Sequence, residues 1–301
     1  MYDGKRVVTV THIGRVESAI LAAPYLLKNQ GLIDEHRYWA DIQDPYALSQ
    51  LHALACQHPE FIKVVRPKAP VAMTATGRHT QMCAFHDDCA DPDTIYIRLA
   101  DDICWLRDDA IEQLVAFRVR NPQYFAVYPA TVNQGRTMYI HQVMGHLPEQ
   151  LMPNWAGEYI DHLDLRRESP VLAKIIHESL LAKIQNNETS DMLFGRYQIP
   201  NYETIPVHAV SWLGEHLAGL GVPKVSLGKI VGHFPEEVWW SEIGPKLAGK
   251  TNCICGTSLV AHYAFCNQLD QLYKTDILAR YTTLSNSVAE ISLNKKNESD
   301  N

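Results

Sequence analysis

The strongest candidate for chemistry in this chain is a pair of adjacent aspartates, Asp101 and Asp102. They directly follow the run at residues 94–99, whose β-branched and aromatic side chains predict a strand. Because burying unpaired charge is costly, two carboxylates at a strand end are better explained by a nearby divalent cation than by packing. Such a cation neutralises the charge that grows on a diphosphate leaving group as its bond breaks. The pair therefore indicates a site for a metal ion and a diphosphate.

Two more aspartate pairs occur in the chain, Asp87 with Asp88 and Asp108 with Asp109. Both fall where helices are expected to begin or end, and carboxylates there serve as caps or interact with the helix dipole. An aspartate pair is thus a weak signal by itself. The position directly after a strand is what distinguishes the pair at residues 101–102.

Strand patterns alternate with helical patterns through the first 130 residues, which is typical of βαβ units and a largely parallel sheet. The expected strands are residues 6–10, 36–40, 61–65, 94–99 and 124–128, and the expected helices are residues 15–29, 44–56 and 108–120. Asp44 with Pro45, and later Ser169 with Pro170, have the residue types that begin helices. Pro129 is expected to end the strand at 124–128. The sequence predicts an α/β fold with an open, mostly parallel, twisted sheet flanked by helices.

Ligands of such a sheet bind outside the carboxyl ends of its strands. The residues expected there are Thr11, Gly14 and Arg15 after the first strand, Asp41 after the second, and Asp101 after the fourth. Neither GxGxxG nor GxxxxGK[ST] occurs, which disfavours a dinucleotide dehydrogenase and a P-loop kinase.

Arg15 and Arg78 are candidate phosphate partners, because a guanidinium matches phosphate oxygens in a two-pronged way. For Arg15 a surface charge is an equally good explanation. Arg98, within a strand, is better explained by pairing with a carboxylate. Asp41 is placed to contact a nucleotide base, and a turn-forming aspartate is almost as good an explanation.

Three segments in this order resemble GT-A glycosyltransferases, specifically a bacterial and viral group like glycosyltransferase family 2. They are "DPDTIYIRLADDICWLRDDAIEQLVAFRVRNPQYFAVYPATVNQ", "AVSWLGEHLAGLG" and "TNCICGTSLVAHYAFCNQ". The first resembles the DxD metal region of that group, and the resemblance extends to about residue 284. It implies one GT-A domain over residues 1–284, with a nucleotide-sugar half at 1–130 and an acceptor half at 131–284. The polar residues 285–301 are expected to form a disordered tail.

The resemblance also implies a role for each matching residue. Asp102 would be the principal ligand of Mn²⁺ or Mg²⁺, with Asp101 on the ribose or on a metal-bound water and His262 as a late metal or phosphate ligand. Glu215 would be the base that deprotonates the acceptor hydroxyl. Two positions depart from the group: Ala100 stands where the triplet usually has Asp, and His216 stands where Asp is expected after Glu215. An imidazole could itself accept a proton, so the departure at position 216 leaves the choice of base open.

The expected activity is transfer of a sugar from a nucleoside diphosphate sugar, most commonly a UDP-sugar, to an acceptor hydroxyl with inversion. The acceptor is expected to be a saccharide, with a modified nucleic-acid base as the second choice. A non-catalytic nucleotide-sugar or carbohydrate-binding module is the alternative that Ala100 motivates. A metal-dependent nucleotidyltransferase would want a basic, Gly-rich triphosphate loop near the first strand, and the sequence has none there.

Composition and charge limit the classes of protein to which the chain can belong. With 46% hydrophobic and 20% charged residues, the chain can bury a sizeable core. The net charge of −7 gives no general attraction to nucleic acid or an anionic membrane. No apolar run reaches the roughly 20 residues that span a bilayer, and no signal-peptide pattern is present, so a cytoplasmic location is expected. The seven cysteines form no CxxC pair, which favours free thiols over a zinc finger.

Overall fold

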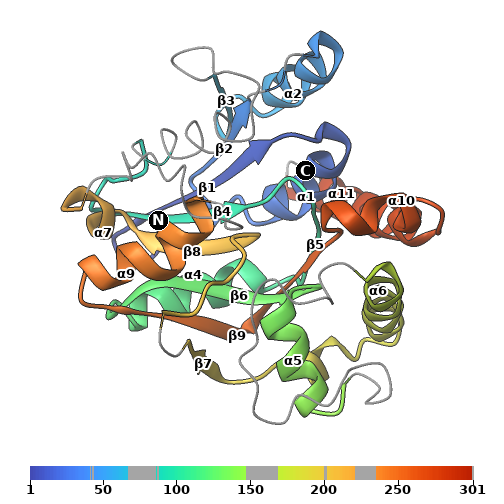
Figure 1. The fold of residues 1–301 in the computed structure, drawn as a ribbon. Coiled ribbons are helices and arrows are strands. Elements are labelled where there is room, and N and C mark those ends of the chain that lie inside the picture. Colours follow the sequence, from blue (N-terminus) through green and yellow to red (C-terminus); the bar gives the residue numbers. More distant parts are fainter. Residues whose placement is uncertain are drawn as a thin grey trace.

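A computed structural model describes residues 1–40, 42, 44–66, 86, 88–146, 169–199, 202–220 and 235–299 of the chain. Its centre is a nine-stranded sheet with the strand order β3-β2-β1-β4-β8-β6-β9-β5, in which β7 also pairs with β9 (Figure 1). The strands are β1 (Arg6–Ile13), β2 (Glu35–Ala40), β3 (Ile62–Val65), β4 (Thr94–Leu99), β5 (Ile103–Leu106), β6 (Tyr124–Val132), β7 (Arg196–Gln198), β8 (Ala209–Leu213) and β9 (Thr251–His262).

Six of the nine strands run in the same direction: β1, β2, β3, β4, β6 and β9. β1 is parallel to both β2 and β4, β3 is parallel to β2, and β6 is parallel to β9. β8 is antiparallel to both β4 and β6, while β5 and β7 are antiparallel to β9. The open, mostly parallel sheet flanked by helices confirms the predicted fold class.

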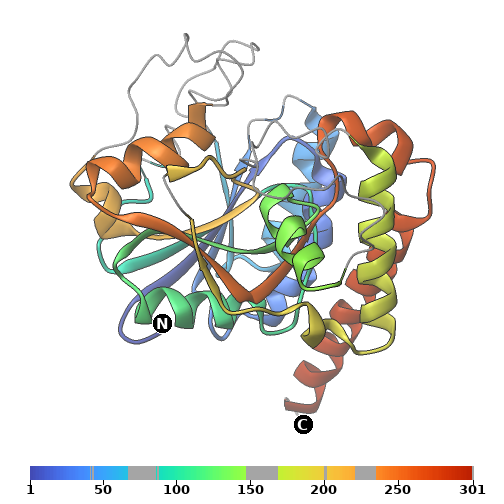
Figure 2. The ribbon, with the colours of Figure 1, turned by 60° about the horizontal axis from the view of Figure 1, so that its bottom comes forward.

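Helices cover both faces of the sheet (Figures 1 and 2). The α-helices are α1 (Val16–Lys28), α2 (Pro45–Gln57), α4 (Ala110–Arg120), α5 (Gly135–Val143), α6 (Pro170–Gln185), α7 (Gly214–Ala218), α8 (Pro235–Val238), α9 (Gly244–Leu247), α10 (Leu269–Leu272) and α11 (Ile277–Ser299). Shorter turns are η3 (Thr189–Met192), the π-helical η5 (Trp239–Ile243) and η6 (Cys266–Gln268). None of the helices in the part of the chain that the structure describes is long and apolar enough to cross a bilayer.

The alternation of side chains along β4 divides the core into two clusters, because successive residues of a strand face opposite sides. Ile95 and Ile97 join the cluster that contains buried residues of α1, α4 and α11. Tyr96 joins a tryptophan-rich cluster with Trp212 of β8 and Trp240 of η5. Both faces of the central strands are therefore buried, as expected for a largely parallel sheet.

Two predicted helix starts are confirmed, whereas the helix expected from residue 108 begins at Ala110, and Asp109 at its N-cap makes no side-chain cap hydrogen bond. The Asp44 side chain accepts a hydrogen bond from the backbone N–H of Tyr46 at 2.9 Å, with Pro45 in the first turn. The Ser169 hydroxyl accepts one from Leu172 at 3.2 Å at the start of α6.

Two predicted ends differ in the structure. β6 continues through Pro129 to Val132, and the pairing of β6 with β9 shifts register at this proline, an irregularity where a missing N–H is tolerated. The last helix continues past residue 284 to Ser299, into the segment expected to be disordered. Ser285 is buried, and its hydroxyl donates to the Leu21 carbonyl of α1 at 2.9 Å, so the beginning of this extension packs against α1.

Gly214 places α7 against the chain just before β4. A Cβ at this position would lie 1.8 Å from the Asp91 carbonyl oxygen, so only glycine permits the approach. Nearby, the Trp212 indole donates to the Cys89 carbonyl at 3.1 Å. The carboxyl end of β8 is thus fixed at the edge of the sheet where β4 begins.

We predict that Gly214→Ala lowers the free energy of unfolding by about 3 kcal/mol, because the Asp91 backbone must move to admit the methyl group. Urea denaturation followed by circular dichroism measures the change. Gly219→Ala is the matched control, since a Cβ there has open space around it. Equal stability of the two variants would contradict the close approach.

Candidate active site

The carboxyl ends of the parallel strands bring several polar residues to one edge of the sheet. Gly14 and Arg15 follow β1, and Asp101 with Asp102 follows β4. The chain passes from β1 outward through β2 and β3 and returns to the other side of β1 at β4, so the strand order reverses between β1 and β4. Such a reversal is where open α/β sheets bind ligands. His262 ends β9 at this same edge.

Asp101 joins the ends of β1 and β4. Its Oδ2 accepts hydrogen bonds from the backbone N–H groups of Gly14 at 2.8 Å and Arg15 at 2.6 Å. A Cβ on Gly14 would lie 3.1 Å from this oxygen, so glycine suits the contact. Burial and the neighbouring Asp102 charge raise the pKa of the Asp101 carboxyl. The Asp101 carboxylate therefore accepts hydrogen bonds from the backbone N–H groups at the start of α1. Helix N-termini of this kind commonly bind anions.

Asp102 is a buried carboxylate with two charged or chargeable partners. Its side chain is 5% exposed, and its Oδ2 accepts from Arg15 Nη2 at 2.5 Å. The same oxygen lies 3.0 Å from His262 Nε2. Burial by itself would raise the pKa of Asp102, but His262 and the Arg15 guanidinium hold it well below its usual range. The carboxylate is thus ionised and depends on nearby positive charge.

The ring of His262 is oriented from behind by a backbone carbonyl. Its Nδ1 lies 3.3 Å from the Asn133 carbonyl oxygen, which can only accept, so a proton on Nδ1 satisfies this contact. Asn133 has a φ of 61°, a left-handed conformation that asparagine tolerates. Its side-chain amide donates to the Tyr263 carbonyl at 3.0 Å and to Gln268 Oε1 at 2.9 Å. These two bonds hold Asn133 in place, and so they fix the backbone carbonyl that contacts His262 Nδ1. The other ring nitrogen of His262, Nε2, then faces Asp102.

His208 completes a cluster of three possible metal ligands. One ligand atom each from Asp102, His208 and His262 lies within 4.8 Å of the others. The two imidazoles stack with their centroids 3.6 Å apart. Because β8 is antiparallel to β4, the residue before β8 lies beside Ala100, whose N–H donates to the His208 carbonyl at 2.6 Å.

The cluster fits a divalent cation in two respects. Two imidazoles and one carboxylate form a common set for divalent transition metals. Metal-binding histidines usually donate their second ring N–H to a carbonyl or carboxylate, as the contact between His262 and Asn133 allows. The residues described here could therefore hold such an ion.

The structure brings together five of the residues predicted from sequence, and adds His208. Gly14, Arg15, Asp101, Asp102 and His262 meet around the ends of β1, β4 and β9, although Gly14 contributes only its backbone. Thr11 is buried within β1, two residues before its end. Asp41 and Arg78 lie outside the described residues. His208 was not predicted, because it reaches the cluster only through the antiparallel insertion of β8.

Glu215 is not brought to this cluster. It is exposed in the first turn of α7, directly after β8. Leu213 of β8 pairs with Ile95 near the beginning of β4, so Glu215 lies at the opposite edge of the sheet from Asp102. The four residue steps from Ile95 to Leu99 alone span about 13 Å. This separation gives no geometric support to Glu215 as a base acting at Asp102.

His216 has a structural position. It is buried, and its Nδ1 lies 3.0 Å from the Phe125 carbonyl oxygen. Burial lowers the pKa of His216 to about 4, so the ring is neutral near pH 7. It stacks on the Phe125 ring, with the centroids 5.8 Å apart.

Arg98 belongs to a separate buried network on the tryptophan-rich face. Its guanidinium lies 3.4 Å from Glu236 Oε2 and donates to the Val207 carbonyl. Glu236 Oε1 lies 2.8 Å from His86 Nε2. Burial opposes ionisation of Glu236, but Arg98 and His86 lower the pKa of this carboxyl to about 2. The pairing of Arg98 with a carboxylate, the explanation favoured from sequence, is what the structure shows.

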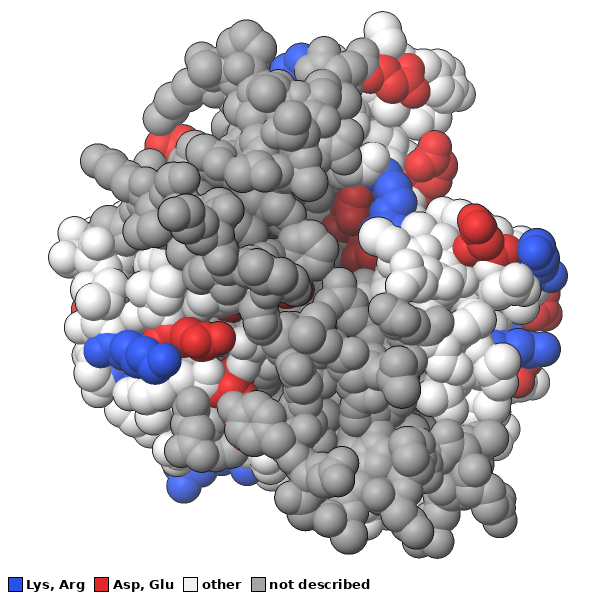
Figure 3. Space-filling view, in the orientation of Figure 1, with Lys and Arg blue, Asp and Glu red and all other residues white. Residues whose placement is uncertain are grey.

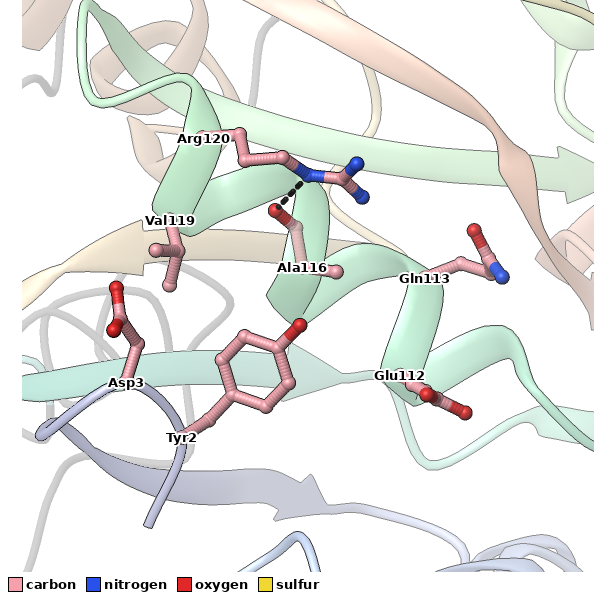
Figure 4. Close-up of a pocket in the computed structure, with 7 residues that line it drawn as sticks. All are labelled: Tyr2, Asp3, Glu112, Gln113, Ala116, Val119 and Arg120. Carbon is pink, nitrogen blue, oxygen red and sulfur yellow. Dashed lines mark hydrogen bonds between the residues drawn. The ribbon is translucent and has the colours of Figure 1, made fainter.

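A groove of about 610 Å³ lies away from this edge, between the N-terminal turn and α4 (Figure 4). It is lined by Tyr2, Asp3, Glu112, Gln113, Ala116, Val119 and Arg120. The groove shares no residue with the cluster. Its lining residues include no histidine or cysteine that could join its carboxylates as a ligand.

Comparisons with known proteins do not assign the chain to a family. No family model matches it, and no curated protein is similar in sequence. A mycobacterial protein of solved structure is 12% identical with a TM-score of 0.46, over 89% of this chain and 70% of that one. CMP:2-keto-3-deoxy-manno-octonic acid synthetase complexed with CTP is 11% identical with a TM-score of 0.45, over 93% and 99%. 4-Diphosphocytidyl-2C-methyl-D-erythritol synthase is 12% identical with a TM-score of 0.30, over 42% and 59%.

At these identities and TM-scores, the likenesses carry no argument about activity. The functional interpretation therefore depends on the geometry of the cluster at the carboxyl edge.

We predict that Glu236→Gln destabilises the protein at pH 7 by on the order of 3 kcal/mol, the amount that corresponds to lowering a pKa from 4.5 to about 2. Because the folded-state pKa is depressed, this stability is present above about pH 4.5 and is lost as the pH falls toward 2. Urea denaturation of both proteins between pH 3 and 7 measures the difference. A difference that stays constant over this range would contradict the ionised network.

Proposed function

We propose that the chain is a metal-dependent glycosyltransferase that moves a sugar from a nucleoside diphosphate sugar to an acceptor hydroxyl. The observation that carries the proposal is the cluster of Asp102, His208 and His262 at the edge where the strand order reverses. The resemblance of three sequence segments to GT-A glycosyltransferases supports the same reaction class.

The donor set favours Mn²⁺ over Mg²⁺. Magnesium requires near-ideal octahedral coordination by oxygen, whereas two of the three candidate ligands are imidazoles. A bound cation would neutralise charge on the diphosphate as the bond to the sugar breaks. In this proposal Asp102 and His262 are the principal ligands, and His208 is the third.

Arg15 and Asp101 are the proposed contacts to the donor itself. The Arg15 side chain is 31% exposed, so its guanidinium borders both Asp102 and the surface. A guanidinium in this place suits a phosphate group. Asp101 lies on the amides of the first turn after β1 and is placed to contact a ribose or a metal-bound water.

A UDP-sugar as donor and a saccharide as acceptor complete the proposal. On the face shown in Figure 3, the described Lys and Arg side chains are scattered among acidic ones rather than gathered into a stripe. The described part of this face therefore lacks the basic stripe that is typical of nucleic-acid binding, and the net charge of the chain is −7. Inversion and a cytoplasmic location stay predictions. We assign no base, because Glu215 lies at the other edge of the sheet.

The first experiment is a calorimetric titration with UDP-sugars, with and without Mn²⁺. We predict binding that requires Mn²⁺ and that weakens by at least about 100-fold in Asp102→Asn, since a principal ligand and the anionic charge are lost. Asp108→Asn is the matched control, because Asp108 is 72% exposed and pairs only with Lys28 in the described structure. Release of UDP from the donor distinguishes an enzyme from a binding module.

Failure of every nucleoside diphosphate sugar to bind, with or without the metal, would contradict the proposed reaction. Equal losses in Asp102→Asn and Asp108→Asn would contradict the assignment of the site. Metal-dependent binding without any turnover would support the non-catalytic module instead.

A further inference from the structure

Asp102 is the one carboxylate among the three candidate metal ligands, and in the structure it pairs with Arg15. Its Nη2 lies 2.5 Å from Asp102 Oδ2, the same oxygen that lies 3.0 Å from His262 Nε2. Asp102 is buried, and a buried carboxylate needs a compensating cation. In the structure the guanidinium supplies that charge, and the Arg15 side chain is 31% exposed.

A guanidinium and a divalent cation cannot share this oxygen comfortably. A metal ligated by Asp102 would bring two like charges to one buried carboxylate, where screening by water is weak. The metal would also crowd an oxygen that already has two close neighbours, Arg15 Nη2 at 2.5 Å and His262 Nε2 at 3.0 Å. Metal and guanidinium are therefore competing partners of Asp102.

The Arg15 backbone is held independently of its side chain. Its N–H donates to Asp101 Oδ2 at 2.6 Å, beside the N–H of Gly14. The side chain is partly exposed, and its second acidic neighbour, Asp101 Oδ1, is 3.4 Å away. The guanidinium can thus leave Asp102 by side-chain rotation while the start of α1 stays in place.

We infer that Arg15 is an internal counter-cation that the metal must displace from Asp102, and that the released guanidinium then binds a phosphate group of the donor. This inference rests on the proposed metal site. It goes beyond that site because it couples the binding of the metal ion to the binding of the nucleoside diphosphate. The metal alone must compete with Arg15, whereas a nucleoside diphosphate accepts the displaced guanidinium. Mn²⁺ and a nucleoside diphosphate therefore bind synergistically, and the synergy resides in Arg15.

The test is the affinity for Mn²⁺, measured by the electron paramagnetic resonance signal of the free ion, with and without UDP. Arg15→Gln keeps a polar side chain of similar reach but removes the charge. We expect it to bind Mn²⁺ alone about tenfold tighter than the wild type, the scale on which a neighbouring charge shifts an equilibrium at a carboxylate. The strengthening by UDP should shrink in this variant. Arg15→Lys keeps a cation and should stay close to the wild type.

Two controls separate this effect from a general change in charge. Arg6→Gln makes the same substitution at the other end of β1, where Arg6 pairs with Glu35 at 3.4 Å, and should leave Mn²⁺ affinity unchanged. The double variant Arg15→Gln with Asp102→Asn should lose the gain, because the ion then lacks its carboxylate. Circular dichroism confirms that each variant is folded.

If the wild type binds Mn²⁺ and Arg15→Gln binds it equally or more weakly, the inference is overturned while the metal site stands. If neither protein binds Mn²⁺, with or without UDP, the proposed function is overturned together with the inference.

Discussion

The buried negative charge of Asp102 is the constraint around which the proposed site is organised. A carboxylate that is 5% exposed is stable only with positive charge or hydrogen-bond donors close by. Arg15 and His262 provide them from β1 and β9, two strands far apart in the chain. Further hydrogen bonds hold both residues in place. The backbone N–H of Arg15 donates to Asp101, and the His262 ring contacts the Asn133 carbonyl. One charge thus links the ends of three strands.

The sheet topology decides which residues can take part. Parallel strands bring the segments after β1, β4, β6 and β9 to one edge, which is the general reason that α/β sheets bind ligands there. Because β8 is antiparallel to β4 and β6, the residues before β8, not those after it, lie at this edge. His208, before β8, arrives at the cluster, and Glu215, after β8, is carried to the far edge.

Local patterns made much of this predictable from sequence. The alternation of strand and helix gave the fold class, and the position of Asp101 and Asp102 after a strand marked the edge that the structure confirms as a meeting point of charged residues. His262 came from resemblance alone. His208 carried no local signal, because its role depends on the direction of one strand. The continuation of β6 past Pro129 depended on an irregular pairing with β9, which is also a non-local feature.

The central claim is that Asp102, His208 and His262 hold a divalent cation beside a diphosphate. Pulsed electron paramagnetic resonance of Mn²⁺ bound in the presence of UDP tests it most directly. The account predicts magnetic coupling of the ion to histidine nitrogen and to phosphorus together, with the nitrogen coupling reduced in His262→Phe. A bound ion coupled to phosphorus without any histidine nitrogen would contradict it.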